Sequence, residues 1–89
     1  MNYKVIVTEK AKKQLAKMDK TAANMIFRWI SKNLTNTNNP RSHGKRLKGN
    51  LQEYWRYRIG DWRLLVTIED DQLIILVVEV GHRKEIYRK

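Results

Sequence analysis

Residues 51–80, LQEYWRYRIGDWRLLVTIEDDQLIILVVEV, decide the fold. Polar and apolar side chains alternate here with a period of two, which is typical of β-strands. Gly60-Asp61 and Asp70-Asp71 interrupt the alternation and predict two tight turns, so the stretch predicts three consecutive strands. The last of these, LIILVV, is apolar on both faces and is therefore expected in the interior of a sheet.

The first turn determines which residues face each other across the hairpin. A two-residue connection at Gly60 and Asp61 places Arg58 directly opposite Arg63, and the period of two puts Arg56 on the same face, the arginine face. The opposite face is expected to be covered by helices and carries Trp55, Tyr57, Ile59, Trp62, Leu64 and Val66.

Directly opposed like charges destabilise a sheet unless an anion or a carboxylate lies between them. Glu53 and Glu79 are the nearest acids in sequence, and their parity predicts that both point to the other face. We therefore favour a phosphate site, which suits the planar guanidinium fork, over a simple solvated basic face.

The end of the last strand extends this prediction. Continued alternation places His82 and Arg83 beside the opposed arginines, and Tyr87 is close enough in sequence to fold back onto the groove. The residues of this strand assigned to the arginine face are Ile74, Leu76, Val78 and Val80.

The N-terminal half reads as one strand and two helices. Residues 3–7, YKVIV, alternate like a short strand, and Thr8 can cap a helix with the apolar stripe Ala11, Leu15 and Met18. A second helix is predicted from Ala22 to Asn33, and residues 35–44, TNTNNPRSHG, are predicted to form a mobile loop. The predicted core positions of this helix are Ala23, Ile26, Phe27, Ile30 and Leu34.

The order strand, helix, helix, strand, strand, strand predicts an α+β fold. Two N-terminal helices are expected to pack on one face of a mostly antiparallel four-stranded sheet.

Charge indicates the kind of partner. Nineteen Lys and Arg against nine Asp and Glu give a formal charge of +10 on 10.7 kDa, a field that attracts nucleic acid, an acidic protein or an anionic membrane surface. The chain has no cysteine, no long apolar segment and no stretch suited to a signal peptide, so we expect a cytoplasmic bacterial protein that does not enter a membrane.

Several kinds of active site find no support in the sequence. The two histidines, His43 and His82, are too few for a metal site, and we predict no metal and no cofactor. Phosphate-loop and nucleophile-elbow motifs are absent as well. RNA carries its own nucleophile, the 2′-hydroxyl, so a protein that supplies only bases, acids and cations could still cleave it.

Two segments together resemble a known family. RLKGNLQEYWRYRIGDWRLLV (46–66) and VGHRKEIYRK (80–89) are similar to the RelE/ParE superfamily of bacterial toxins, and more closely to its RelE branch of mRNA interferases. The resemblance covers nearly the whole chain, so residues 1–89 are expected to form a single RelE-like domain.

The resemblance implies an activity and partners. A RelE-like toxin of a type II toxin–antitoxin system is a metal-independent, ribosome-dependent endoribonuclease that cleaves mRNA and inhibits translation. It is held inactive by an acidic cognate antitoxin, and operator DNA is expected to be bound only through the toxin–antitoxin complex.

The resemblance also assigns roles to residues. Arg56, Arg58, Arg63 and Arg83 correspond to the basic residues around the scissile phosphate, and Tyr87 to the tyrosine that orients the substrate. Lys45, Arg46 and Lys48 are expected to hold RNA or the ribosome. The glutamate that serves as base in one branch is replaced by Lys45, so the base is Lys45, Lys48 or His82, with His82 preferred if it faces the groove.

Two other functions fit the same sequence. A ParE-like toxin of this fold inhibits DNA gyrase without nuclease chemistry, and would not need the converging arginines. A plain nucleic-acid-binding module would show salt-dependent binding and no RNA cleavage.

Overall fold

The computed structural model of this chain describes residues 2–82. Seven helices and strands follow one another as β1 (Lys4–Val7), α1 (Glu9–Lys17), α2 (Lys20–Asn33), β2 (Lys45–Arg46), β3 (Trp55–Ile59), β4 (Trp62–Glu69) and β5 (Ile74–His82). Two short 3-10 helices, η1 (Pro40–Ser42) and η2 (Gly49–Leu51), lie on either side of β2.

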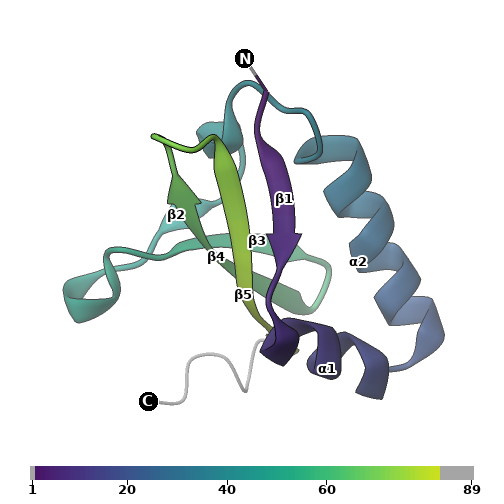
Figure 1. Cartoon of the computed structure of the whole chain (residues 1–89). Helices are drawn as coiled ribbons and strands as arrows, with labels where there is room; N and C mark the ends of the chain where they lie inside the picture. The colour runs from purple at the N-terminus through teal and green to yellow at the C-terminus, as the bar shows by residue number, and fades with distance from the viewer. Residues whose placement is uncertain (1, 83–89) are drawn as a thin grey trace.

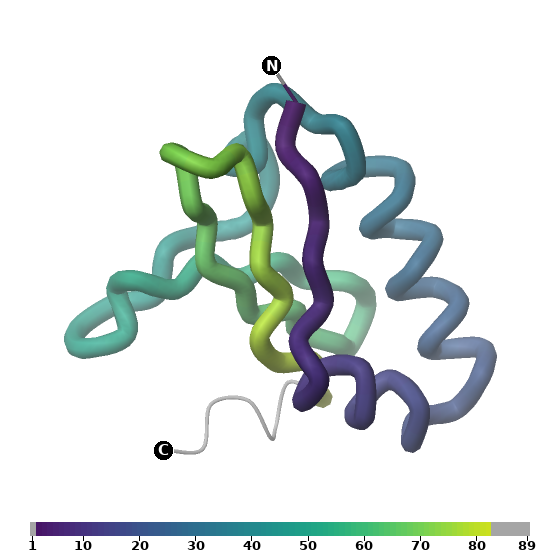
Figure 2. The backbone as a smooth tube through the Cα atoms, in the orientation of Figure 1, coloured from purple at the N-terminus to yellow at the C-terminus, as the bar shows by residue number. Residues whose placement is uncertain are grey.

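The strands form one sheet in the order β1-β5-β4-β3-β2. β1 runs parallel to β5, as Figure 2 shows, and the other neighbours are antiparallel. The expected α+β architecture is confirmed, but the sheet has five strands where four were predicted. The fifth is β2, whose two residues Lys45 and Arg46 pair with Arg56 and Trp55 from within what the sequence presents as loop.

Both helices begin at side-chain caps. Thr8 accepts a hydrogen bond from the amide of Ala11 at 3.2 Å, as predicted for α1. Asp19 accepts from the amides of Thr21 and Ala22, and α2 therefore begins at Lys20, two residues before its predicted start.

The two helices pack on the same face of the sheet (Figure 1). The predicted core position Phe27 is wrong, because this residue is 48% exposed and lines a surface hollow with Val7 and Leu15. No helix within residues 2–82 is long and apolar enough to cross a membrane. The core comprises Ala11, Leu15, Ile26, Ile30, Leu34, Tyr57, Ile59, Leu64, Val66, Ile75, Val77 and Val80.

The β3–β4 hairpin has the predicted register, with Arg58 opposite Arg63 and Ile59 opposite Trp62. Gly60 has a φ of +60°, as the first central residue of a type II′ turn requires. The other turn is longer than the predicted Asp70-Asp71 pair. It spans residues 70–73, because the strands pair up to Glu69–Ile74 and Leu73 takes a left-handed conformation with φ +56°.

The loop after α2, predicted to be mobile, is held against the sheet by side chains of β3. Tyr57 donates a hydrogen bond to the carbonyl of Pro40 at 2.6 Å, and the indole of Trp55 donates to the carbonyl of His43 at 2.7 Å. Gly44 follows with φ +79°, and a Cβ there would overlap the carbonyl oxygen of Arg56. These contacts bring β2 into the sheet.

Candidate nucleic-acid interface

The sheet face turned away from the helices carries two cross-strand pairs of like charge. Arg58 of β3 lies opposite Arg63 of β4, and Lys45 of β2 lies opposite Arg56 of β3. Since partners across an antiparallel ladder share a face, all four cations belong to the arginine face. The sequence predicted Arg56, Arg58 and Arg63 on this face. It did not predict Lys45 there, because the pairing of Lys45 depends on β2.

The charge of the opposed arginines is not neutralised by an acid within residues 2–82. Neither Arg58 nor Arg63 forms an ion pair with a described carboxylate. Glu79 does lie on the arginine face, opposite Leu65, contrary to the prediction, but its carboxylate is 3.3 Å from Lys10 Nζ. The arginine face is therefore a strongly positive surface suited to an anion.

The two opposed arginines have different environments. Arg58 is exposed, whereas only 6% of Arg63 is accessible to solvent. A terminal nitrogen of Arg63 donates to the carbonyls of Trp62 at 3.2 Å and Gly60 at 3.5 Å. Its buried Nε has no hydrogen-bond partner among residues 2–82. Arg63 thus stabilises the hairpin turn through these hydrogen bonds, and its charge makes the electrostatic potential beside Arg58 more positive.

A hollow on this face is lined by Gly44, Lys45, Arg56 and Arg58. Its walls come from β2, β3 and the glycine that lets the loop approach β3. Three cations around one open depression can bind a phosphate by charge and by several N–H donors at once.

The predicted position of His82 beside the opposed arginines is wrong. β5 carries an extra residue opposite the Leu65–Val66 step, and this bulge reverses the alternation for the rest of the strand. Val80 and His82 consequently lie opposite Leu64 and Trp62, on the helix-covered face. Val80 is buried, and the imidazole of His82 contacts the Trp62 ring edge-on at 5.6 Å.

The remaining predicted residues lie elsewhere. Arg46 pairs with Trp55 and so faces away from Lys45, while Lys48 precedes η2 and is exposed. Arg83 and Tyr87 lie outside the described residues. Within residues 2–82, no three acidic or histidine side chains converge on a possible metal site.

A cluster that the sequence did not indicate stabilises the far end of the sheet. Arg41 binds Asp70 through two hydrogen bonds of 3.0 Å, and Tyr3 donates to the same carboxylate at 2.6 Å. These two donors lower the pKa of Asp70 and the hydrogen bond raises the pKa of Tyr3. Residues 67 apart in the chain meet here, and no local pattern reveals such a contact.

Comparison with known protein families identifies the family of this chain. The model of the family described as the ParE toxin of the type II toxin–antitoxin system parDE matches residues 5–87. The chain belongs to the RelE/ParE toxin superfamily.

Similar proteins carry RelE names. Toxin RelG of Mycobacterium tuberculosis is 29% identical over 89 residues, which cover both chains completely. The toxin–antitoxin complex RelBE2 of the same organism contains a chain of TM-score 0.83 and 26% identity, covering 96% of this chain and 95% of that one. A double mutant of the E. coli toxin RelE in the free state has a TM-score of 0.76 at 20% identity, covering 97% of this chain and 88% of that one, and this likeness supports the fold alone. This RelE/ParE chain is accordingly a toxin of a type II toxin–antitoxin system.

Proposed function

We propose that this toxin is a ribosome-dependent endoribonuclease that cleaves mRNA and so inhibits translation. The observation that supports it best is the direct opposition of Arg58 and Arg63 on one face of the sheet, where neither forms an ion pair with an acid of residues 2–82. A surface that kept such a pair only for packing would be destabilised by it, whereas a phosphate binder gains from it. The similarity to RelE-named toxins gives independent support.

The proposed reaction is attack of the RNA 2′-hydroxyl on the adjacent phosphate. The protein has to stabilise the charge that accumulates on the phosphoryl oxygens and to move a proton at each end. Arg58, exposed on the arginine face, donates to these oxygens, and Arg56 and Lys45 around the hollow hold the flanking backbone. Arg63 keeps the hairpin in place and adds positive potential. Arg83 and Tyr87 retain the roles that the family resemblance implies for them.

Lys45 becomes the preferred candidate for the base. It lies across the strand from Arg56 and lines the hollow, whereas His82 lies on the other face. Arginine is a poor base because it stays protonated. Lys48, in the loop that follows β2, is the second candidate.

The proposed regulator is a cognate acidic antitoxin. A chain of charge +10 with an exposed basic face is complementary to an acidic, largely disordered segment. Operator DNA would be bound only through that complex, and the toxin would act in the cytoplasm of a bacterium on the ribosome. Solved relatives include several complexes of RelE with RelB.

The test is brief induction of the toxin in a bacterium and mapping of new 5′ ends on a translated mRNA and on the same message without its start codon. Arg58→Gln is the test variant, because Arg58 is exposed and its loss leaves no described partner unpaired. Lys4→Gln, which removes an exposed charge from β1, is the control.

Cuts confined to the translated message, abolished by Arg58→Gln and kept by Lys4→Gln, would support the proposal. Full cleavage by Arg58→Gln would refute the arginine face as the site. Cuts in the untranslated message would refute the requirement for the ribosome.

A second candidate is inhibition of DNA gyrase, which the ParE description of the matching family favours. It predicts DNA breaks on induction, growth arrest without new mRNA ends, and little effect of Arg58→Gln on toxicity.

A further inference from the structure

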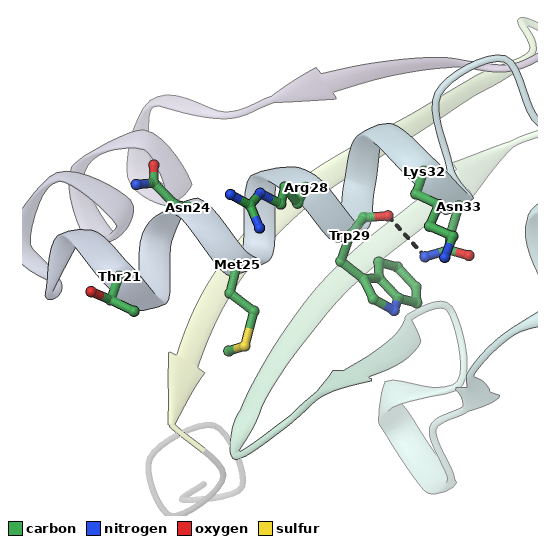
Figure 3. A pocket seen from close by; sticks show the side chains of 7 residues that line it. All are labelled: Thr21, Asn24, Met25, Arg28, Trp29, Lys32 and Asn33. Carbon is green, nitrogen blue, oxygen red and sulfur yellow. Dashed lines mark hydrogen bonds between the residues drawn. The ribbon is translucent and has the colours of Figure 1, made fainter.

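The outer surface of α2 carries a second positive site that the arginine face does not include. Arg28 and Lys32 are exposed and lie one helical turn apart. Both line an open hollow of about 660 Å³ that Figure 3 shows along α2. Together with Asn24, the same two cations also line an adjoining hollow on α2, which Phe27 and Ser31 complete.

Within residues 2–82, no acidic side chain neutralises the charges of Arg28 and Lys32. α2 contains no Asp or Glu, and within residues 2–82 neither Arg28 nor Lys32 forms an ion pair. Like charges at this spacing weaken a helix slightly unless an anion is bound between them. Four residues of helix rise about 6 Å, a spacing comparable with that of successive phosphates along one RNA strand.

The floor of the hollow has groups that can contact a nucleotide. Trp29 is held by its neighbours, with ring centroids 5.2 Å from Tyr57 and 5.7 Å from His43. Asn33 donates to the Trp29 carbonyl at 3.0 Å, which leaves its own side-chain oxygen available, as Figure 3 shows.

The other lining residues are polar as well. Thr21 and Asn24 offer a hydroxyl and an amide, and Met25 is the aliphatic exception. This set of groups suits RNA: the two cations can bind phosphates, and the amides, the hydroxyl and the indole can contact 2′-hydroxyls and base edges. It suits an acidic helix less well, because the apolar side chains of such a helix would need an aliphatic groove.

We propose that the α2 surface formed by Asn24, Arg28, Trp29 and Lys32 binds the backbone of structured RNA. It lies on the helix layer, and the arginine face on the opposite side of the sheet, so one toxin would contact RNA at two separate places. The identity of this RNA rests on the proposed function. If the toxin acts on the ribosome, the RNA bound by α2 is ribosomal RNA, and this contact holds the toxin beside the mRNA that the arginine face cleaves.

The test is equilibrium binding of the full chain to purified 30S ribosomal subunits and to a short single-stranded RNA over a range of salt. Every protein carries Arg58→Gln, so that RNA is not consumed. The comparison among variants is then independent of whether the toxin cleaves RNA, and failure of the proposed function would appear only in the cleavage experiment.

The test variant is Arg28→Gln with Lys32→Gln, and the control of equal net charge is Lys13→Gln with Lys17→Gln on α1, both of whose positions are exposed. The test variant should bind 30S subunits about tenfold more weakly, with a salt slope lower by about 1.8, the value for two lost phosphate contacts. The control should stay within about twofold of the parent.

A second pair of variants guards against a folding defect. Asn24→Asp introduces a carboxylate between the cations and should weaken 30S binding, whereas Asn38→Asp in the exposed loop should not. Ultraviolet cross-linking should attach RNA to the peptide that contains Trp29.

Equal losses in the test and control pairs would overturn the proposal, since net charge alone would then explain binding. It would also be overturned if the α2 variants lost binding to poly-L-glutamate and kept their affinity for 30S subunits, because the surface would then be a site for an acidic protein.

Discussion

Removing one arginine of the opposed pair should stabilise the toxin and remove most of its anion binding. Arg58 and Arg63 lie directly across the β3–β4 ladder, and Arg58 has no ion pair with a described residue. A directly opposed like-charge pair costs roughly 0.2 to 1 kcal/mol. Arg58→Gln keeps a long polar side chain and removes this repulsion, so we expect the free energy of unfolding to rise by about 0.5 kcal/mol, or Tm by about 2 to 4 °C.

Phosphate should reverse the order of stability. An anion that binds only the folded chain stabilises it by about 1.4 kcal/mol at ten times its Kd, which raises Tm by about 6 to 11 °C. The wild-type chain should gain this increase and Arg58→Gln should lose most of it. The assay is thermal unfolding by circular dichroism in cacodylate buffer, with and without phosphate, at constant ionic strength.

Lys4→Gln provides the control, because it removes a charge from an exposed strand position opposite Ile74. It should change Tm little and keep the full response to phosphate. The reasoning would be refuted if Arg58→Gln melted below the wild type without phosphate, or if phosphate raised the Tm of both proteins equally.

Three further perturbations test how the loop and the sheet edge are held. Tyr57→Phe removes the buried donor to the Pro40 carbonyl, and urea unfolding should show a loss of about 1 to 3 kcal/mol; an unchanged midpoint would mean that water replaces the phenol. Gly44→Ala adds a Cβ that overlaps the Arg56 carbonyl at a left-handed φ, so it should lower Tm clearly and weaken RNA binding by displacing β2; wild-type melting would contradict this. The folded pKa of Asp70 lies below its ordinary value of 3.8, so its contribution to stability is present above that value and lost as pH falls through the folded pKa. Asp70→Asn should therefore be less stable than wild type above about pH 5, and the difference should shrink below about pH 4; a constant difference would exclude the carboxylate as its cause.

The sequence by itself determined the order of the helices and strands apart from β2, and the register of the β3–β4 hairpin. Both depend on local rules: Thr8 and Asp19 cap the helices, and the Gly60-Asp61 turn fixes which residues face each other. The opposition of Arg58 and Arg63 followed from that register without any knowledge of the rest of the fold.

Only the tertiary structure decided that Lys45 joins the arginine face and that His82 does not. β2 becomes a strand because Tyr57 and Trp55 hold the preceding loop, and this brings Lys45 opposite Arg56. The bulge in β5 turns His82 to the other face, since one extra residue reverses a period of two. Neither effect has a local sequence signal, because each arises from contacts between segments far apart in the chain.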